Sequence, residues 1–418
     1  MVSHMQKRQA AMVFIMITLF LDILGIGIII PVLPELIKQF VGGDESAAAA
    51  YFGPLAAAYA LMQFVFAPIL GGLSDRFGRR PVILFALFGL GVDYLIQGFA
   101  PNIFWLFIGR ILAGIMGASF TAANAYIADI STPENRAQNF GLVGVAFGLG
   151  FIFGPALGGI LGEVWIRLPF FVSAGLVFIN VLYGFFVLPE SLKPDNRSSF
   201  SWAKANPISS ILSLRNYPLV AGLAVSFMLV SLAQRGLETT WVLYTGFRFG
   251  WGELTNGLTL ALVGVMAVIV QGFLIRPAIK RFGERRSIII GLSLSVLTFF
   301  MYGIATEWLM YVIIVVGALS GIAGPAIQGL VAGTVRPDEQ GKVQGALTSL
   351  TSLTSVFAPL IFTTALFGYF TSSNAPVTLP GAPFFLGSLL FLIALFLLVR
   401  LFGKLPAAKQ DMDVAATD

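Results

Sequence analysis

The sequence predicts an all-α integral membrane protein with twelve transmembrane helices, and two observations carry this prediction. First, 57% of the 418 residues are hydrophobic and only 11% are charged, whereas a soluble globular protein carries about 25% charged residues. Second, the apolar runs are continuous over about 20 residues, the length of a membrane-spanning helix, whereas transmembrane strands alternate over about 10. Soluble enzymes, disulfide-stabilised secreted proteins and disordered chains are therefore excluded.

The apolar segments are separated by charged or Pro/Gly-rich breaks, which give their order along the chain. Each segment is long enough to cross a bilayer as a helix, so each is expected to be one span. The cores of the twelve spans are expected at residues 12–32, 51–73, 82–100, 103–130, 140–162, 170–188, 219–245, 254–279, 288–305, 308–335, 343–370 and 384–401.

Composition also excludes several kinds of chemistry. The chain has no Cys and a single His, His4, so a Ser/His/Asp triad and a His- or Cys-based metal site have no residues to be built from. No Gly-rich phosphate-binding loop with its Lys and Ser/Thr is present. We expect no metal, no cofactor and no enzymatic activity, with a proton gradient as the driving force.

The basic residues indicate the orientation in the membrane. With the N-terminus in the cytoplasm, all but five of the 25 Lys and Arg residues fall in cytoplasmic segments; Lys38, Arg167 and Arg248 fall outside, and Arg110 and Arg235 fall within spans. Cytoplasmic loops carry the Lys/Arg excess, so both termini are expected inside, in the cytoplasmic (inner) membrane of a bacterium. The net charge of +5 is therefore assigned to topology and not to a nucleic-acid partner.

An internal repeat divides the chain into two halves. The sequence Asp-Arg-Phe-Gly-Arg-Arg at residues 75–80 is echoed 205 residues later by Lys-Arg-Phe-Gly-Glu-Arg, and a Pro-acid pair at 133–134 is echoed at 337–338. Parallel six-helix repeats are typical of secondary transporters with a site near the midplane. We expect an N-terminal bundle at 1–188, a polar cytoplasmic linker at 189–218, a C-terminal bundle at 219–405 and a cytoplasmic tail at 406–418.

The loop after the second span reads Gly-Gly-Leu-Ser-Asp-Arg-Phe-Gly-Arg-Arg at residues 71–80. It resembles the cytoplasmic signature of the major facilitator superfamily, and the whole chain is similar to the twelve-span drug:proton antiporters of that family. Asp75 can cap a helix N-terminus in the other half, and the arginines can pair with carboxylates such as Asp129 or Glu134. The expected latch on the cytoplasmic side comprises Gly71, Asp75, Arg76, Gly78, Arg79 and Asp129.

The fifth predicted span carries a second motif. Its small residues allow neighbouring helices to approach closely, and its proline kinks the helix. The spacing resembles the motif that distinguishes antiporters from uptake symporters, although ordinary Gly-rich helix packing is the alternative. The motif residues are Gly141, Gly150, Gly154, Pro155, Gly158 and Gly159.

Charged side chains within the spans are candidates for proton coupling. Asp22, which is followed by Pro31 and Pro34 as near the entrance of twelve-span antiporters, is costly as an anion at membrane depth and is therefore a candidate proton carrier. Arg110 lies on a stripe of small and polar residues and matches the arginine of the family's fourth-span motif, which implies a part in proton coupling. A purely structural role remains the alternative for each.

Two residues of the seventh span, Arg235 and Glu238, lie three positions apart on one helical face. If they reach a cavity, they can bind a zwitterionic or anionic substrate, and Glu238 becomes a second proton-coupling candidate. If they pair with each other, they make the helix easier to insert.

Asp93 matches an acidic position of tetracycline exporters, with structural and functional roles both open. Further candidates for a largely apolar substrate pocket are Gln63, Asn124, Gln271 and Gln328.

Short stretches at residues 59–63, 248–251 and 325–329 resemble tetracycline exporters. Aligned from them, a His and an Asp of the class B exporters correspond here to Ala267 and Ser295. Whether tetracycline is the substrate, and whether protons follow the same route, is therefore left open.

The expected function is proton-coupled export of small hydrophobic or amphipathic compounds by alternating access, as in multidrug or tetracycline-like efflux and antibiotic resistance. The alternative is a carrier for one metabolite, such as a sugar, nucleoside or organic anion. We expect a monomer that interacts with its substrate, protons and the lipid bilayer.

Overall fold

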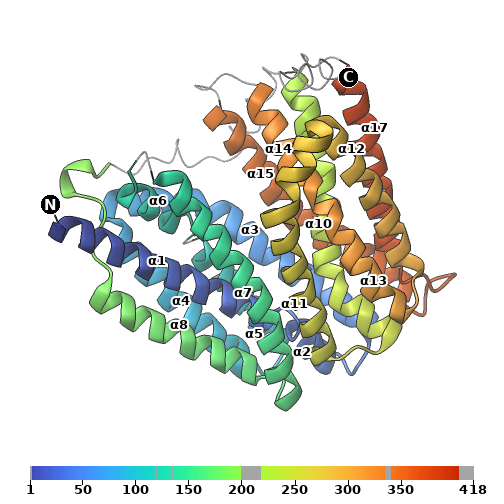
Figure 1. The fold of residues 1–418 in the computed structure, drawn as a ribbon. Helices are drawn as coiled ribbons and strands as arrows, with labels where there is room; N and C mark the ends of the chain where they lie inside the picture. The colour runs from blue at the N-terminus through green and yellow to red at the C-terminus, as the bar shows by residue number, and fades with distance from the viewer. Residues whose placement is uncertain (1, 119, 133–134, 199–217, 335–339, 404–418) are drawn as a thin grey trace. The chain divides into compact units, whose positions relative to one another are not determined.

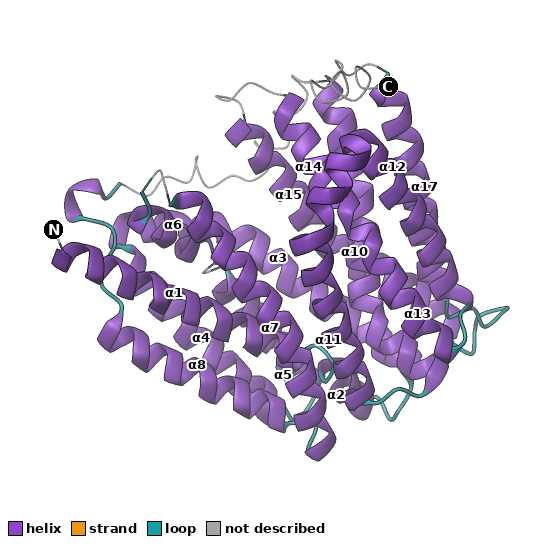
Figure 2. Ribbon diagram, viewed as in Figure 1, coloured by secondary structure: helices purple, strands orange, loops and turns teal. Residues whose placement is uncertain are grey.

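The structure, a computed structural model, describes residues 2–118, 120–132, 135–198, 218–334 and 340–403. Every regular element within these ranges is helical, as Figure 2 shows. Most of the expected linker (199–217), the tail (406–418), Glu134 and the second echo at 337–338 lie outside them. The fold class is the one predicted from the long apolar runs.

The helices gather into two compact units. The N-terminal unit comprises Met1–Pro207 with Thr245–Gly264, and the C-terminal unit comprises Ile208–Tyr244 with Val265–Asp418. The division differs from a simple cut within the linker, because the stretch Thr245–Gly264 packs with the first group of helices. Each unit has its own buried apolar core.

The N-terminal unit is built on long helices that run side by side (Figure 1). Within it, α1 packs against α7 and α8, α4 packs against α5 and α8, and α3 packs against α5. The Asp44 carboxylate starts α3 by accepting the backbone N–H groups of Ser46 and Ala47, as an N-cap does. The elements are α1 (Val2–Ile29), α2 (Leu33–Phe40), α3 (Glu45–Phe77), α4 (Arg79–Phe99), α5 (Ile103–Gly117), α6 (Phe120–Ile130), α7 (Arg136–Val164), α8 (Leu168–Val187), the 3₁₀ turn η1 (Pro194–Asn196) and most of α11 (Glu253–Ile269).

In the C-terminal unit, α12 packs against α14 and α17. Two helices widen into π-helical turns, and one of these turns begins at Pro359, which has no N–H group for the normal helical hydrogen bond. The elements are α10 (Pro218–Phe249), η3 (Val270–Leu274), α12 (Ile275–Ile304), α13 (Glu307–Ala318), η4 (Leu319–Ile322), α14 (Ala323–Thr334), α15 (Gln340–Ala358), η5 (Pro359–Gly368), α16 (Tyr369–Thr371) and α17 (Ala382–Phe402).

Eleven helices of the described ranges are long and apolar enough to cross a membrane. The difference from twelve arises at one place, a continuous run of 52 residues from Glu253 to Ile304. At 1.5 Å per residue this run is about 78 Å long, more than twice the apolar thickness of a bilayer. Its backbone leaves the helical conformation at Gly283 (φ 74°, ψ 165°), so it contains both spans expected at 254–279 and 288–305.

The repeated sequence motif also has a repeated backbone conformation. Gly78 (φ 104°) and Gly283 (φ 74°), 205 positions apart, both have a positive φ, which glycine adopts without steric cost. The Arg76 guanidinium lies 5.1 Å from the ring centre of Phe77, and the Arg281 guanidinium lies 5.6 Å from that of Phe282. The two loops of the repeat therefore fold alike.

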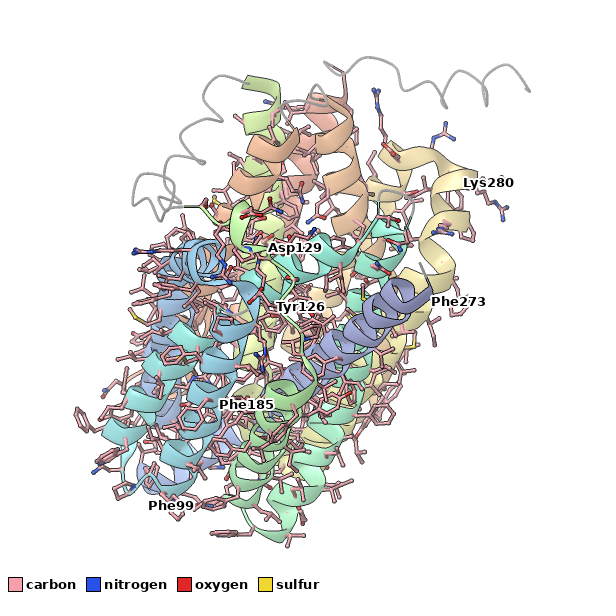
Figure 3. All side chains as sticks on the ribbon, turned by 90° about the vertical axis from the view of Figure 1, so that its left-hand side faces the viewer. Phe99, Tyr126, Asp129, Phe185, Phe273 and Lys280 are labelled. Atoms are coloured by element: carbon pink, nitrogen blue, oxygen red, sulfur yellow. The ribbon has the colours of Figure 1, made fainter. Side chains whose placement is uncertain are left out.

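Large apolar side chains cover the outside of the helices. Phe99 and Phe185 of the N-terminal unit and Phe273 of the C-terminal unit are 70%, 59% and 71% exposed, and Figure 3 shows their positions. Exposed apolar surface on this scale is unfavourable in water and is accommodated by lipid. Together with the eleven long apolar helices, it identifies a multi-pass membrane protein.

Candidate functional site

Asp22 lies in the middle of α1, where its side chain is buried (3% exposed). Polar contacts fix α1 against α8 on either side of it: the Thr18 hydroxyl donates to Asn180 Oδ1 at 3.2 Å, and the Ser173 hydroxyl donates to the Gly25 carbonyl at 3.3 Å. Among the described residues, Asp22 Oδ1 has no hydrogen-bond partner. The structure therefore places an incompletely satisfied carboxyl group within a membrane-spanning helix.

The second buried carboxyl group, Asp93 of α4, is fully satisfied. Gln97, one turn further along the helix, donates from Nε2 to both Asp93 oxygens at 2.9 and 2.8 Å. Gly109 of α5 admits the carboxyl group, because a Cβ atom there would lie 2.8 Å from Asp93 Oδ1. This side chain is thus anchored between α4 and α5.

Arg110 of α5 contacts an aromatic side chain of α3. Its guanidinium lies 4.3 Å from the ring centre of Tyr59, a cation–π geometry, and its charge acts on both Tyr59 and Asp93. Gly114 lets α5 approach, since a Cβ atom there would lie 2.7 Å from the Cβ of Met62. In the described part of the chain, the buried Arg110 Nε has no hydrogen-bond partner.

Gln63 is the predicted substrate residue that joins this group. Its Nε2 lies 3.4 Å from the Tyr59 hydroxyl and 3.5 Å from the Gly117 carbonyl. Asn124, in α6, is exposed. Sequence reasoning missed Tyr59, although its position four residues before Gln63 on one helix was a usable signal.

In the C-terminal unit, Arg235 and Glu238 contact each other. Arg235 Nη1 lies 2.6 Å from Glu238 Oε2, and the two side chains are 44% and 41% exposed. Of the two interpretations left open by the sequence, mutual pairing is the one found. Gln271 in η3 and Gln328 in α14 are exposed.

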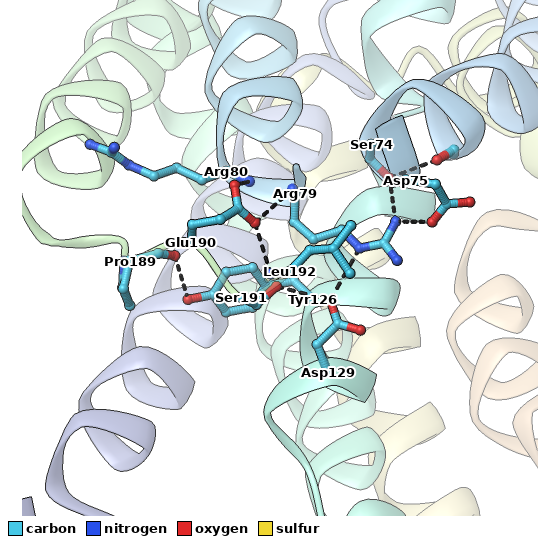
Figure 4. A network of polar contacts seen from close by, with 11 residues as sticks. Ser74, Asp75, Arg79, Arg80, Tyr126, Asp129, Pro189, Glu190, Ser191 and Leu192 are labelled. Carbon is cyan, nitrogen blue, oxygen red and sulfur yellow. Dashed lines mark hydrogen bonds and ion pairs between the residues drawn. The ribbon is translucent and has the colours of Figure 1, made fainter. Parts of the chain in front are cut away.

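The signature loop forms the network of Figure 4. Arg79 Nε donates to Asp129 Oδ2 at 3.1 Å, while its Nη1 donates to the Ser74 hydroxyl at 2.7 Å and to the Asp75 carboxylate. The expected pairing of a loop arginine with Asp129 is therefore present. Arg76 makes no ion pair with Asp129: its side chain is exposed and its guanidinium lies over the ring of Phe77. Its pairing with Glu134, which lies outside the described residues, stays a prediction.

Two glycines complete the loop. Gly71 lies close to α6, because a Cβ atom there would be 3.0 Å from the Thr121 methyl carbon. Gly78 separates α3 from α4, and its positive φ is the reason that position favours glycine. A glycine has no side chain with which to cap α4, so the first backbone N–H groups of that helix need an acceptor from elsewhere.

That acceptor is Glu190, which sequence reasoning missed. Its Oε1 accepts the N–H group of Arg79 at 2.9 Å, and its Oε2 accepts that of Arg80 at 3.2 Å. The same segment is held by Ser191, which donates to Asp129 Oδ2 at 3.0 Å, and by the Tyr126 hydroxyl, which donates to the Pro189 carbonyl at 3.0 Å. The first residues after α8 are therefore part of the loop network (Figure 4).

The antiporter motif brings α7 against α1. A Cβ atom at Gly154 would lie 2.7 Å from the Gly27 Cα, and one at Gly158 would overlap the Ile28 carbonyl oxygen. One at Gly150 would lie 2.6 Å from a methyl carbon of Ile23. These three glycines permit direct backbone contact between two helices, as small-residue motifs do in membranes.

The next part of the motif faces α11. A Cβ atom at Gly159 would lie 2.6 Å from the Glu253 carbonyl, and one at Gly257 would overlap the Pro155 carbonyl. Gly141 makes no close contact among the described residues, because a Cβ atom there would meet none of them within 4 Å. The spacing of the glycines does not tell which of them faces a neighbour, so the place of Gly141 in the motif stays a prediction.

Comparison with known proteins relates these features to a family. The chain matches the family model described as Major Facilitator Superfamily over residues 15–359 and again over 272–413. Among the described residues, no group of three or more His, Cys, Asp or Glu side chains could hold a metal ion.

Curated relatives match over nearly the whole chain. The sequence is 40% identical to the tetracycline resistance protein, class C, of Escherichia coli, over 93% of this chain and 96% of that protein. It is 37% identical to the class B protein of the same organism, over 82% of this chain and 85% of that protein. The human organic anion transporter MFSD10 has a similar fold (TM-score 0.68, 24% identity, 94% of this chain and 99% of that one). The protein belongs to the Major Facilitator Superfamily and is a membrane transporter, not an enzyme.

Proposed function

We propose that this protein exports tetracycline-like and related amphipathic drugs in exchange for protons, by alternating access. The relatives named as tetracycline resistance proteins, at 34–40% identity over most of the chain, support a proton-coupled drug exporter. The spacing of the fifth-span motif resembles that of antiporters and so supports export, and three of its glycines, Gly150, Gly154 and Gly158, pack α7 against α1.

The observation that carries the proposal is Asp22. It is 3% exposed and its Oδ1 has no partner among the described residues. Such a group is costly as an anion at membrane depth and inexpensive when protonated. Loading and release of its proton can therefore favour different conformations, which is the differential binding that an exchange cycle requires.

Arg110 has a secondary role in this proposal. Its charge acts on Asp93 and on Tyr59 within the same unit, so it can respond to a change of charge in the cluster. Glu238 is a weaker proton-coupling candidate than Asp22, because Arg235 already compensates its charge. Gln63, Asn124, Gln271 and Gln328 are proposed to line the drug pathway.

The remaining parts of the proposal concern the membrane location, the oligomeric state and the driving force. We place the protein as a monomer in the cytoplasmic membrane with both termini in the cytoplasm, because the Lys and Arg residues concentrate in the loops of that side. The proton gradient is the driving force, with no cofactor. The metabolite-carrier alternative depends on a substrate-facing dipole at Arg235 and Glu238, and it receives less support because the two side chains form an ion pair with each other.

Purified protein in liposomes with an internal pH dye tests the proposal. Tetracycline, cationic dyes, sugars and organic anions are added to the wild type, to Asp22→Asn and to Asp195→Asn, a control at an exposed carboxylate. We expect drug-evoked proton movement in the wild type and the control, and none in Asp22→Asn, which should still bind tetracycline. A response confined to one polar metabolite, or full activity of Asp22→Asn, would contradict the proposal.

A further inference from the structure

Tyr94 is the second buried side chain next to Asp22 with an unsatisfied polar atom. Its side chain, in α4, is 3% exposed, and among the described residues its hydroxyl has no hydrogen-bond partner. A buried tyrosine hydroxyl normally finds a partner. An unpaired hydroxyl near an unpaired carboxyl oxygen indicates a pair that forms in another state of the molecule.

The position of the hydroxyl is defined by a glycine of α1. A Cβ atom at Gly25 would lie 3.2 Å from the Tyr94 hydroxyl oxygen and 3.5 Å from the adjacent ring carbon Cε2. Gly25 follows Asp22 by three residues, so the two lie on one face of α1, one turn apart. The hydroxyl therefore lies beside α1 one helical turn from Asp22, so close to Gly25 that an added Cβ atom would press against it.

Most other polar groups nearby already have partners, although Gln97 Oε1 and Arg110 Nε have none among the described residues. Gln97 donates to both oxygens of Asp93, and the Ser173 hydroxyl donates to the Gly25 carbonyl. The charges that act on Tyr94 come from Asp22, Asp93 and Arg110, together with the phenol of Tyr59. No charge from α7 or α8, which pack against α1, acts on Asp22 within the described residues. Asp22 is thus the carboxyl group with an acceptor oxygen to spare.

We propose that the Tyr94 hydroxyl donates a hydrogen bond to the Asp22 carboxylate after that group has released its proton. This inference rests on the proposed proton-coupled export. Tyr94 keeps its own proton and acts through Asp22 as a positioning residue. Because a hydrogen bond to a charged acceptor is stronger than one to a neutral acceptor, the hydroxyl favours the deprotonated form. It therefore sets the pH at which Asp22 releases its proton during transport.

Tyr94→Phe removes only the hydroxyl, so it isolates this interaction. Without the donor, Asp22 retains its proton to a higher pH, and the midpoint of tetracycline-driven proton movement against pH should rise by about one unit, a tenfold change in proton affinity. Tetracycline binding at low pH should remain within about twofold of the wild type. Tyr183→Phe is the matched control, because that ring packs against Phe14 and its side chain is 37% exposed; the midpoint of this variant should not move.

Two further variants keep the test decisive. Gly25→Ala should displace the hydroxyl and move the midpoint in the same direction, and it replaces Tyr94→Phe if that variant does not fold. In the Asp22→Asn background, Tyr94→Phe should change tetracycline binding no further.

The outcomes separate this inference from the function on which it rests. If the wild type moves no protons with any drug, the proposed function fails and the inference fails with it. If the wild type is active and Asp22→Asn is inactive, but Tyr94→Phe and Gly25→Ala both keep the wild-type midpoint, only the role of Tyr94 is overturned.

Discussion

Glu190 accepts the backbone N–H group of Arg79 at 2.9 Å, across 111 positions of sequence, and so caps the start of α4. The helix needs this cap because Gly78, the residue before it, has no side-chain acceptor. A carboxylate at a helix N-terminus also interacts favourably with the helix dipole. The first residues of the expected linker therefore stabilise the signature loop as well as connecting the two bundles.

This relationship predicts the effect of Glu190→Gln. The amide keeps the shape of the side chain but removes its charge, so the cap is weakened and the free energy of unfolding should fall by about 1 kcal/mol. The change is measured as a shift of the thermal transition of the purified protein in detergent. Asp195→Asn, at an exposed carboxylate of the same segment, should leave the transition in place. Equal shifts in both variants would argue against capping.

A second prediction concerns the three contacts of the Arg79 guanidinium. Its guanidinium binds Ser74, Asp75 and Asp129 at once, and a lysine ammonium cannot reproduce that planar arrangement. Arg79→Lys should therefore lower the initial rate of tetracycline-driven proton movement several-fold. Arg76→Lys serves as the control, since that exposed side chain lies over Phe77, and it should keep the wild-type rate. A larger loss in Arg76→Lys than in Arg79→Lys would reverse the assignment.

Features that depend on a local sequence pattern could be predicted from the sequence. The apolar runs predicted the helices, and opposite charge predicted the pairing of a loop arginine with Asp129. The echo at 205 positions predicted an internal repeat, and its two glycines, Gly78 and Gly283, both have a positive φ. Such features repeat with the helical period or stand at fixed spacing, so they are visible without a structure.

Features that depend on long-range packing could not be obtained in this way. Charge alone did not distinguish Arg79 from Arg76, because the ion pair of Arg79 with Asp129 depends on how α4 packs against α6. Glu190 gave no local signal for its role in α4. Tyr94 reads as one more aromatic residue of an apolar helix until its hydroxyl is seen to lie over Gly25.

The glycines of α7 give a third prediction, with the control inside the motif. A methyl group at Gly158 would overlap the Ile28 carbonyl oxygen, whereas one at Gly141 would meet nothing within 4 Å. Gly158→Ala should force α1 and α7 apart and lower the free energy of unfolding by about 1–3 kcal/mol. Gly141→Ala should be neutral or slightly stabilising. Thermal transitions of the two variants give the comparison, and equal losses would contradict the assigned contacts.

The last prediction separates the two possible uses of Arg235 and Glu238. Because the two charges lie 2.6 Å apart, removing either one takes away the other's ion-pair partner at membrane depth, which is unfavourable. Arg235→Ala and Glu238→Ala should each lower the yield of folded protein, and the double variant should recover it. If the pair serves insertion alone, the double variant should bind anionic and cationic drugs with affinities changed equally. A selective loss of anionic drugs would instead show that Arg235 contacts substrate, and a double variant that folds less well than either single variant would exclude mutual neutralisation.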